Sequence, residues 1–346
     1  LQVLRNPTRS VRIGSVTKQF TAAAILALEG RGKLSVSDPV SKHLADYPQP
    51  GAAVTIHQLL SHTSGIPSYT DDTAVMNARE RHLDVAALLA TFKDKPLEFE
   101  PGSKWSYSNS NYAVLGAIIE RVSGMSYARF MHETIFAPAG LARTVVGDAA
   151  TMPNRAAGYQ PDGDALVDAR PIDMSVPFAA GAIRSTARDL WTWHRALGSD
   201  RILSRPLRDK LYTPVKRDYA YGWMVQELHG HRVVAHGGGI DGFLTSYVRV
   251  PDADLVVVVL SNNTRSNPDA IARAAVAAAF GKPIVPLDDP KPTDIDPVIA
   301  RRIAGRYKLT PKSRAELTAK GIPDEALASI EPVDIRPKKN VLELQP

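Results

Sequence analysis

Hydrophobic residues recur at helical spacing in the first two thirds of the chain. Four helices are predicted on this basis, at residues 19–28, 56–60, 112–122 and 187–197. The first of them is apolar on nearly every side and rich in helix-forming residues, whereas 112–122 is amphipathic. We therefore expect 19–28 to be a buried helix, because it has almost no polar face to present to solvent.

After residue 220 the pattern changes to short β-branched or aromatic runs separated by turn residues. These runs predict strands at 221–228, 232–236, 245–250 and 254–261, followed by a helix at 267–280. Residues 254–261 are apolar on both faces, which predicts a central strand covered by helices on both sides. The expected fold class is α/β of the α+β kind: a mainly antiparallel sheet flanked by helices, with an all-helical lobe at about 35–185.

Proline and aspartate become frequent from Pro283 onward, which is typical of a linker. We therefore predict a main domain over residues 1–285 and a Pro-rich linker with a C-terminal extension over 286–346. Residues 303–309 are compatible with the start of a small β module, but the following tail has too few alternating segments to complete a barrel.

Composition narrows the functional classes. The chain has 346 residues, is 44% hydrophobic and carries a net charge of +6, yet its basic residues are scattered among acidic ones. We therefore predict no nucleic-acid partner. The absence of cysteine excludes disulfides and thiol catalysis. No apolar run approaches the roughly 20 residues of a membrane helix, so no integral membrane segment is expected.

Ser15 and Lys18 are candidates for a serine nucleophile and its base. They lie three residues apart where a glycine-containing loop enters the predicted buried helix, so both side chains lie on one helical face. A base within hydrogen-bond reach is what activates a serine hydroxyl. The helix start also offers the N–H of Ser15 to an oxyanion. Alone the pattern is weak, since it equally fits a capped helix with a solvated lysine.

Tyr107 and Asn109 precede the second long helix and supply a phenol and an amide. We expect Tyr107 to be partly ionised or to share its proton with Lys18 in a relay. We expect Asn109 to bind substrate or to orient Lys18. A phenol is a poor base at neutral pH unless cations lie beside it. Lys18 and His236 are the expected cations. The alternative is a tyrosine that packs on the following helix with its hydroxyl in water.

His236, Gly237, Gly238 and Gly239 follow a predicted strand, and glycines allow a substrate to approach the backbone closely. An edge strand of this kind can align a substrate by main-chain hydrogen bonds. We expect the N–H of Gly239 to complete an oxyanion hole with that of Ser15, and His236 to assist binding or proton transfer. The alternative is a glycine-rich hairpin with a surface histidine.

Taken together, these three motifs resemble those of the serine β-lactamase and penicillin-recognising superfamily, in its class C-like branch. Ser15 to Lys18 is similar to the family's Ser-x-x-Lys, Tyr107 to Asn109 to its Tyr-x-Asn, and His236 to Gly238 to its third motif. Supporting segments are 59–65 and 221–223. The resemblance spans roughly residues 10–281.

This resemblance implies a β-lactamase/transpeptidase-like fold in which Ser15 is acylated and then released by water, without a metal or organic cofactor. Implied substrates are small molecules or short peptides: amides of D-amino acids, or esters. His236 stands where β-lactamases of this class have lysine, which disfavours efficient β-lactam hydrolysis. The alternatives are a β-lactamase proper and a catalytically idle relative that binds peptidoglycan fragments or partners.

Three further expectations concern location, metals and the substrate pocket. The resemblance implies a periplasmic or secreted protein, and a cytoplasmic form stays open because the chain shows no signal peptide. The remaining histidines have no metal-ligand spacing, so no metal site is predicted. An aromatic pocket formed by Tyr69, Tyr221 and Phe243 is expected to contact substrate, because these residues lie near the motifs in sequence. The oligomeric state is left open.

Overall fold

The computed structural model describes residues 8–148, 154–163, 165–284, 305–307, 310–311, 314, 318, 333–338 and 341–345. The chain divides into two compact units. The first contains Leu1–Thr70 and Ala74–Ile284, and the second contains Asp71–Thr73 and Val285–Pro346. All the candidate catalytic residues belong to the first unit.

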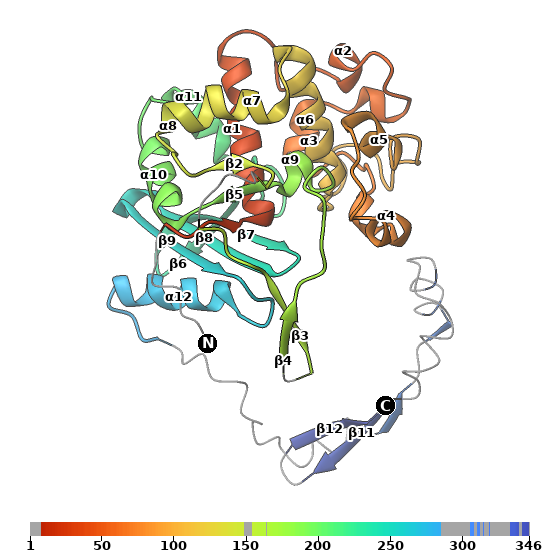
Figure 1. Cartoon of the computed structure of the whole chain (residues 1–346), viewed down its shortest axis with the longest axis vertical. Coiled ribbons are helices and arrows are strands. Elements are labelled where there is room, and N and C mark those ends of the chain that lie inside the picture. The colour runs from red at the N-terminus through yellow and green to blue at the C-terminus, as the bar shows by residue number, and fades with distance from the viewer. Residues whose placement is uncertain are drawn as a thin grey trace. The chain divides into compact units, whose positions relative to one another are not determined.

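A four-stranded antiparallel sheet lies at the centre of the first unit (Figure 1). Its strands, in spatial order, are β6 Met224–Leu228, β7 His231–Ile240, β8 Phe243–Val250 and β9 Leu255–Ser261. Strand β7 is longer than predicted and runs through the whole glycine segment, because its pairing with β8 continues to Ile240 opposite Phe243. The short turn that follows keeps the two strands in register.

The predicted strand at 254–261 forms and packs on both faces, but its residues are half-buried and it does not lie at the centre of the sheet. Alternate β9 residues pack against the main core and against the cluster that contains Val276 of α12, which spans Pro268–Ala279. Both faces are therefore covered, as expected. Among the described strands, however, β9 pairs only with β8 and lies at the sheet edge. Apolar residues on both faces of a strand indicate that both faces are covered, but they do not indicate how many strands pair with it.

Helices cover the sheet and form much of the remainder of the first unit (Figure 1). Beside α12 they are α1 Thr17–Gly30, α2 Val40–His43, α3 Ile56–Leu60, α4 Thr73–Asn77, α5 Val85–Ala90, α6 Asn109–Ser123, α7 Tyr127–Met131, α8 Ala137–Ala139, α9 Phe178–Gly181, α10 Ala187–Leu197 and α11 Arg205–Leu211. The predicted helices 19–28, 56–60, 112–122 and 187–197 correspond to α1, α3, α6 and α10. Helix α3 is held by a capping box between Thr55 and Gln58.

The segment 35–185 contains helices α2 to α9 and also short strands, which the expected all-helical lobe did not include. Strands β3 Tyr159–Asp162 and β4 Ala165–Asp168 form a hairpin. Strand β2 Val145–Val146 joins β1 Val11–Arg12 and β5 Ile183–Ser185 in a small sheet of order β1-β5-β2. These strands are too short to show an alternating pattern in the sequence.

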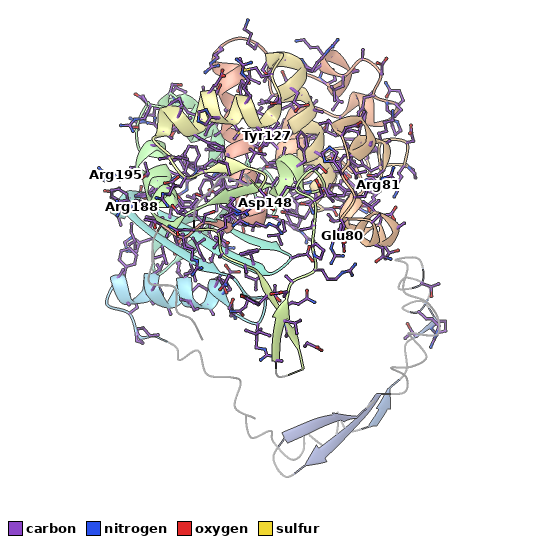
Figure 2. All side chains as sticks on the ribbon, in the orientation of Figure 1. Glu80, Arg81, Tyr127, Asp148, Arg188 and Arg195 are labelled. Carbon is purple, nitrogen blue, oxygen red and sulfur yellow. The ribbon has the colours of Figure 1, made fainter. Side chains whose placement is uncertain are left out.

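Helix α1 is buried along nearly its whole length, as its composition predicted. Phe20 stacks on Trp193 of α10 with ring centroids 4.5 Å apart. The hydroxyl of Thr21 lies 2.7 Å from the phenol of Tyr127, whose position among the helices is marked in Figure 2. Because large side chains hold it on several sides, the helix that follows Ser15 is rigidly placed.

In the second unit the described residues form a three-stranded antiparallel sheet. Its strands are β10 Gly305–Tyr307, β11 Val333–Lys338 and β12 Val341–Gln345, in the order β10-β11-β12. The predicted linker between 286 and 304 lies outside the described residues. Nowhere in the described chain is a helix both long and apolar enough to cross a lipid bilayer.

Candidate active site

Ser15 lies in a single 3₁₀ turn, Gly14–Val16, between strand β1 and helix α1. The turn is fixed by the N–H of Ile13, which donates to the carbonyl of Ile183 at 3.0 Å. Gly14 has φ +51°, and a Cβ there would lie 2.8 Å from the carbonyl oxygen of Gly239. Only glycine satisfies both conditions, so the backbone before the nucleophile touches the glycine segment of β7 directly.

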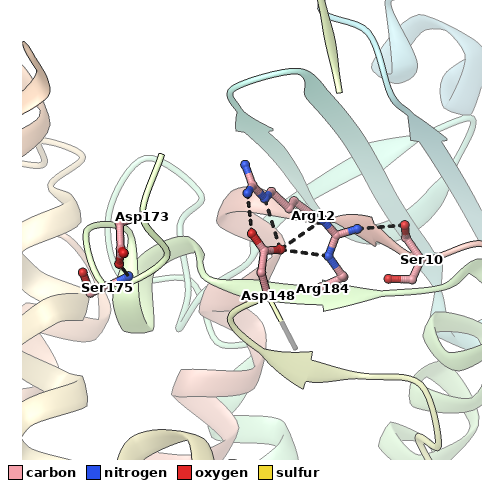
Figure 3. A network of polar contacts seen from close by, with 6 residues as sticks. All are labelled: Ser10, Arg12, Asp148, Asp173, Ser175 and Arg184. Atoms are coloured by element: carbon pink, nitrogen blue, oxygen red, sulfur yellow. Dashed lines mark hydrogen bonds and ion pairs between the residues drawn. The ribbon is translucent and has the colours of Figure 1, made fainter. Parts of the chain in front are cut away.

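An ion-pair network fastens the strand that leads to Ser15 (Figure 3). Asp148 accepts hydrogen bonds from Arg184 Nε and Nη2 at 3.1 Å each, and it is ion-paired with Arg12 on the neighbouring strand. Arg184 also donates to the carbonyl of Ser10 at 3.0 Å. The two guanidinium groups lower the pKa of Asp148 against the opposing effect of its partial burial. The network therefore ties β1 to β5 on the approach to the nucleophile.

Lys18 contacts the nucleophile directly. Its Nζ lies 3.0 Å from Ser15 Oγ, 2.8 Å from Asn109 Oδ1 and 2.9 Å from the carbonyl oxygen of Ala180. The side chain has no solvent-exposed surface. Burial lowers the pKa of the Lys18 amine well below the usual value of a lysine.

The partners of Lys18 determine where its lone pair points when the amine is neutral. Asn109 Oδ1 and the Ala180 carbonyl can only accept hydrogen bonds, so they take the two N–H groups of the neutral amine. The remaining position faces Ser15 Oγ. The arrangement therefore directs the nitrogen lone pair at the hydroxyl proton of Ser15, as a general base requires.

Asn109, the first residue of α6, is itself held in a fixed orientation. Its backbone N–H donates to Ser68 Oγ at 3.0 Å, and its Nδ2 donates to Thr70 Oγ1 at 2.9 Å. The amide nitrogen therefore faces Thr70 and the amide oxygen faces Lys18. Of the two roles expected for Asn109, the geometry supports the orientation of Lys18.

Tyr107 lies on the other side of Ser15, and its hydroxyl donates to Ser15 Oγ at 2.8 Å. Burial raises the pKa of Tyr107, and the hydrogen bond to Ser15 offsets only part of this effect. The expected ionised phenol is therefore not supported. Tyr107 is a protonated donor, because the environment that removes charge from Lys18 also disfavours a phenolate.

His236 is not the cation that was expected beside Tyr107. Its Nε2 lies 3.0 Å from the hydroxyl of Tyr219 and its Nδ1 lies 2.6 Å from the carbonyl oxygen of Gly237. Burial and the positive charge of Lys18 lower its pKa to about 4, so the ring is neutral at pH 7. Both nitrogens are engaged within the protein, which disfavours the predicted direct part in proton transfer.

His62 supports the loop that carries Tyr107, although the sequence marked it only as part of a supporting segment. Its Nδ1 accepts from the backbone N–H of Ser108 at 3.2 Å, and its carbonyl accepts from the N–H of Ser106 at 3.0 Å. Its ring lies against that of Tyr107, with centroids 4.4 Å apart. Burial is the main cause that lowers the pKa of His62. Electrostatic repulsion from Lys18 and His236 lowers this pKa further. A neutral His62 therefore holds Tyr107 in place.

Strand β7 presents its glycine segment to Ser15 along an edge that β6 does not cover. Pairing with β6 ends at Ala235, whereas pairing with β8 continues to Ile240. In an antiparallel ladder alternate residues direct their N–H groups to opposite sides of the strand. The N–H of Gly239 therefore points away from β8 and toward the nucleophile. Gly238 is packed most tightly, since a Cβ there would lie 2.0 Å from the carbonyl oxygen of Ile13.

A cavity of about 120 Å³ opens beside the nucleophile. Its walls include Ser15, Asn109 and Gly239, together with the aliphatic side chains of Ile172 and Val176. His236, Gly237 and Gly238 are not among its lining residues. The structure thus brings Ser15, Lys18, Tyr107, Asn109 and Gly239 together, and places His236, Gly237 and Gly238 behind them.

The predicted aromatic pocket does not form as one surface. Tyr69 lines the cavity, with its hydroxyl donating to the carbonyl of Val176 at 2.7 Å. Tyr221 instead contacts His57 Nδ1 through its hydroxyl at 2.6 Å, and Phe243 lines a neighbouring cavity. Nearness in sequence to the motifs misplaced two of the three residues, because it does not determine the direction in which a side chain points.

No group of three His, Asp or Glu side chains is placed to hold a metal ion within the described part of the chain. The polar groups at Ser15 instead satisfy one another through hydrogen bonds. They comprise a nucleophile, an amine, a phenol and backbone N–H donors, which is the set that acyl transfer by a serine requires.

Comparison with known proteins gives consistent similarities. The family model described as Beta-lactamase matches residues 5–282. Penicillin-binding protein 4* of Bacillus subtilis (strain 168) is 32% identical over 337 residues, which cover 88% of this chain and 73% of that protein. The chain spans 65% and 54% of two further curated relatives, which are longer.

Two solved structures share the architecture. A D-stereospecific amidohydrolase from Streptomyces sp. is 30% identical, with a TM-score of 0.71, over 79% of this chain and 87% of that chain. An octameric penicillin-binding protein homologue from Pyrococcus abyssi is 27% identical, with a TM-score of 0.72, over 98% of this chain and 76% of that chain.

Proposed function

The chain belongs to the beta-lactamase family, and we propose that it is a serine hydrolase that works through a covalent acyl-enzyme at Ser15. One observation carries this proposal. The Nζ of the buried Lys18 and the hydroxyl of Tyr107 lie 3.0 Å and 2.8 Å from Ser15 Oγ, on the same oxygen. A hydroxyl held between an amine of lowered pKa and a phenol is poised to lose its proton as it attacks a carbonyl.

In acylation, neutral Lys18 accepts the hydroxyl proton as Ser15 Oγ bonds to the substrate carbonyl carbon. The N–H groups of Ser15 and Gly239 stabilise the negative charge that develops on the carbonyl oxygen. The departing nitrogen or oxygen is protonated through Tyr107, which recovers a proton from the Lys18 ammonium. Water then attacks the ester, and the same relay returns the proton to Ser15.

Amides and esters of D-amino acids are the substrates we propose. Support comes from the similar D-stereospecific amidohydrolase and from the modest cavity beside Ser15. A β-lactamase is the second candidate, because Ser15 and Lys18 would acylate a β-lactam by the same chemistry. A catalytically idle binding protein is disfavoured by the short contacts on Ser15 Oγ. We propose a periplasmic or secreted location from family membership alone.

Labelling with a fluorophosphonate tests the proposed nucleophile. We expect intact-mass analysis to show one adduct per chain, peptide mapping to place it on Ser15, and the Ser15→Ala variant to stay unlabelled. Ser35, which lies outside the cavity, provides the matched control, and Ser35→Ala should label normally. Well-folded wild-type protein that takes up no label would exclude an activated serine and favour the idle binding protein.

The pH dependence of the rate follows from the lowered pKa of Lys18. Only the neutral amine can accept the Ser15 proton, so kcat/KM should rise with pH as Lys18 loses its proton. Because burial lowers that pKa well below the usual lysine value, we expect the rise to be complete well below pH 10. A pH–rate profile with a substrate that does not titrate measures this directly. A rise that follows the normal pKa of lysine would contradict the role of Lys18 as base.

A further inference from the structure

Asp241 occupies the turn between β7 and β8, two residues after Gly239. Strand β7 ends at Ile240, strand β8 begins at Phe243, and Asp241 with Gly242 forms the turn between them. Asp241 lines the cavity beside the nucleophile, together with Gly239 and Ile240. The same short segment thus carries the expected oxyanion donor and an acidic side chain.

Asp241 gives the cavity its electrostatic character. Of the described residues that line it, Asp241 alone has a carboxylate, and none has a basic side chain. The opposite wall is aliphatic, formed by Ile172, Val176 and Pro177. Arg79 compensates part of the charge of Asp241, but a ligand that displaces the remaining water from the carboxylate must supply a hydrogen-bond donor of its own. The cavity therefore favours a ligand that brings a positive charge.

Arg79 holds the carboxylate from outside the cavity. Its Nη2 donates to Asp241 Oδ1 at 2.8 Å, and its Nη1 donates to the carbonyl of Met76 at 2.9 Å. Arg79 is not among the lining residues, so the carboxylate lies between the guanidinium and the cavity. This leaves Asp241 Oδ2, the second carboxylate oxygen, as an acceptor for a ligand.

Asp241 also lines a second, more open cavity, whose walls carry four arginines and two further aspartates: Arg12, Arg155, Arg170, Arg184, Asp148 and Asp168. Arg12 and Arg184 both form ion pairs with Asp148, which neutralises one of their two positive charges. These arginines attract anions over a distance but form no part of the wall near Ser15. At contact, a charge-assisted hydrogen bond to Asp241 is the shorter-range and stronger interaction for a ligand at Ser15.

We propose that Asp241 binds the free ammonium group of a small aminoacyl substrate, and so selects unblocked aminoacyl amides or esters over their N-acylated or uncharged counterparts. The inference rests on the proposed function at Ser15 and specifies its substrate class. The ammonium donates to the Asp241 carboxylate, while a small side chain meets the aliphatic wall of Ile172 and Val176.

The spacing along β7 fits this assignment. Asp241 follows Gly239 by only two residues, and both residues line the cavity beside Ser15. In an aminoacyl group the amine is attached to the carbon next to the carbonyl. A substrate whose carbonyl oxygen accepts from the N–H of Gly239 therefore holds its amine close to that donor, within the same small cavity that Asp241 lines.

Protection against fluorophosphonate labelling tests the inference with two ligands of equal size. Glycinamide carries an ammonium group where glycolamide carries a hydroxyl, and both are achiral, so the result does not depend on stereochemical preference. At constant ionic strength and pH 7, we expect glycinamide to halve the labelling rate at roughly one tenth of the concentration of glycolamide, as a charged hydrogen bond exceeds a neutral one.

Two substitutions separate ammonium binding from a structural tether between Arg79 and Asp241. Asp241→Asn keeps the hydrogen-bond acceptor for Arg79 but removes the charge, and it should bring the two ligands to nearly equal protection. Arg79→Met removes the tether but keeps the carboxylate, and it should leave the preference for glycinamide intact or larger. A purely structural role predicts instead that both variants weaken both ligands alike.

The possible failures are distinguishable. If Ser15 is labelled but wild-type protein does not discriminate, or if Asp241→Asn keeps the preference, the inference is overturned and the proposed function stands. If wild-type protein takes up no label, the proposed function fails and the substrate assignment fails with it. Folding of each variant is checked by its urea unfolding midpoint, so that lost protection is not mistaken for unfolding.

Discussion

Replacement of Lys18 by methionine should lower kcat/KM by about 10²–10⁴-fold, in line with loss of a general base. The substitution keeps the length of the side chain and removes only the amine that faces Ser15 Oγ at 3.0 Å. Methionine cannot accept a proton, so Ser15 must attack without assistance. Labelling by a fluorophosphonate should slow by a similar factor, because it depends on the same proton transfer.

The stability of the Lys18→Met variant separates catalysis from folding. Lys18 is fully buried, and its desolvation opposes folding, whereas a thioether side chain is well suited to a core. The loss of hydrogen bonds to Asn109 and Ala180 acts in the opposite direction. We therefore expect little change in the free energy of unfolding. Lys33→Met, at an exposed position, is the control and should retain activity. A Lys18→Met variant with near wild-type rates would require another base.

Gly238→Ala is expected to damage both stability and activity. A methyl group at this position would lie 2.0 Å from the carbonyl oxygen of Ile13 and 3.3 Å from the nitrogen of Ser15. The contacted atoms belong to the backbone, so relief requires β7 to separate from the nucleophile turn. We expect a loss of about 1–3 kcal/mol in the free energy of unfolding, the usual cost of overpacking. A shift of about 1 Å in the oxyanion donors would lower kcat about 100-fold.

The neighbouring glycine supplies a matched control. At Gly237 an added Cβ would have its nearest described neighbours at 3.6 Å, on the carboxylate of Asp269, and at 3.8 Å. These are ordinary van der Waals distances, so Gly237→Ala should unfold at nearly the wild-type urea concentration and keep its activity. Equal damage from both substitutions would mean that strand flexibility, and not the contact with Ile13, decides the outcome.

The sequence predicted the elements that carry the candidate site more accurately than their contacts. Local propensity and apolar spacing were sufficient for helices α1, α6 and α10 and for the existence of strands β6 to β9, but not for the position of β9 in the sheet. The end of β7 could not be predicted, because glycine weakens a strand locally. Pairing with β8 extends the strand through Gly237 to Ile240 regardless, which is a tertiary effect.

Contacts made by backbone groups could not be predicted from the sequence. The carbonyl of Ala180 orients Lys18 from a segment that no motif marks, since every residue carries a carbonyl. The orientation of His236 toward Tyr219 depends on a side chain outside the three motifs. Burial, which the motif pattern does not report, disfavours the partly ionised form of Tyr107 that was one of the two expected. The pattern identified which groups meet at Ser15, but not the environment that sets their charge.

Two of the three partners of Lys18 come from segments that are distant in sequence. Asn109 lies 91 positions from Lys18, and Ala180 lies 162 positions away. Contacts of such long range form only when the intervening chain has folded, because loop closure opposes them until the native packing is complete. A nascent or partly unfolded chain therefore carries an ordinary, unreactive serine. Covalent labelling of Ser15 consequently reports that the chain has reached its native topology. The rate at which the label appears during refolding measures how fast these long-range contacts form.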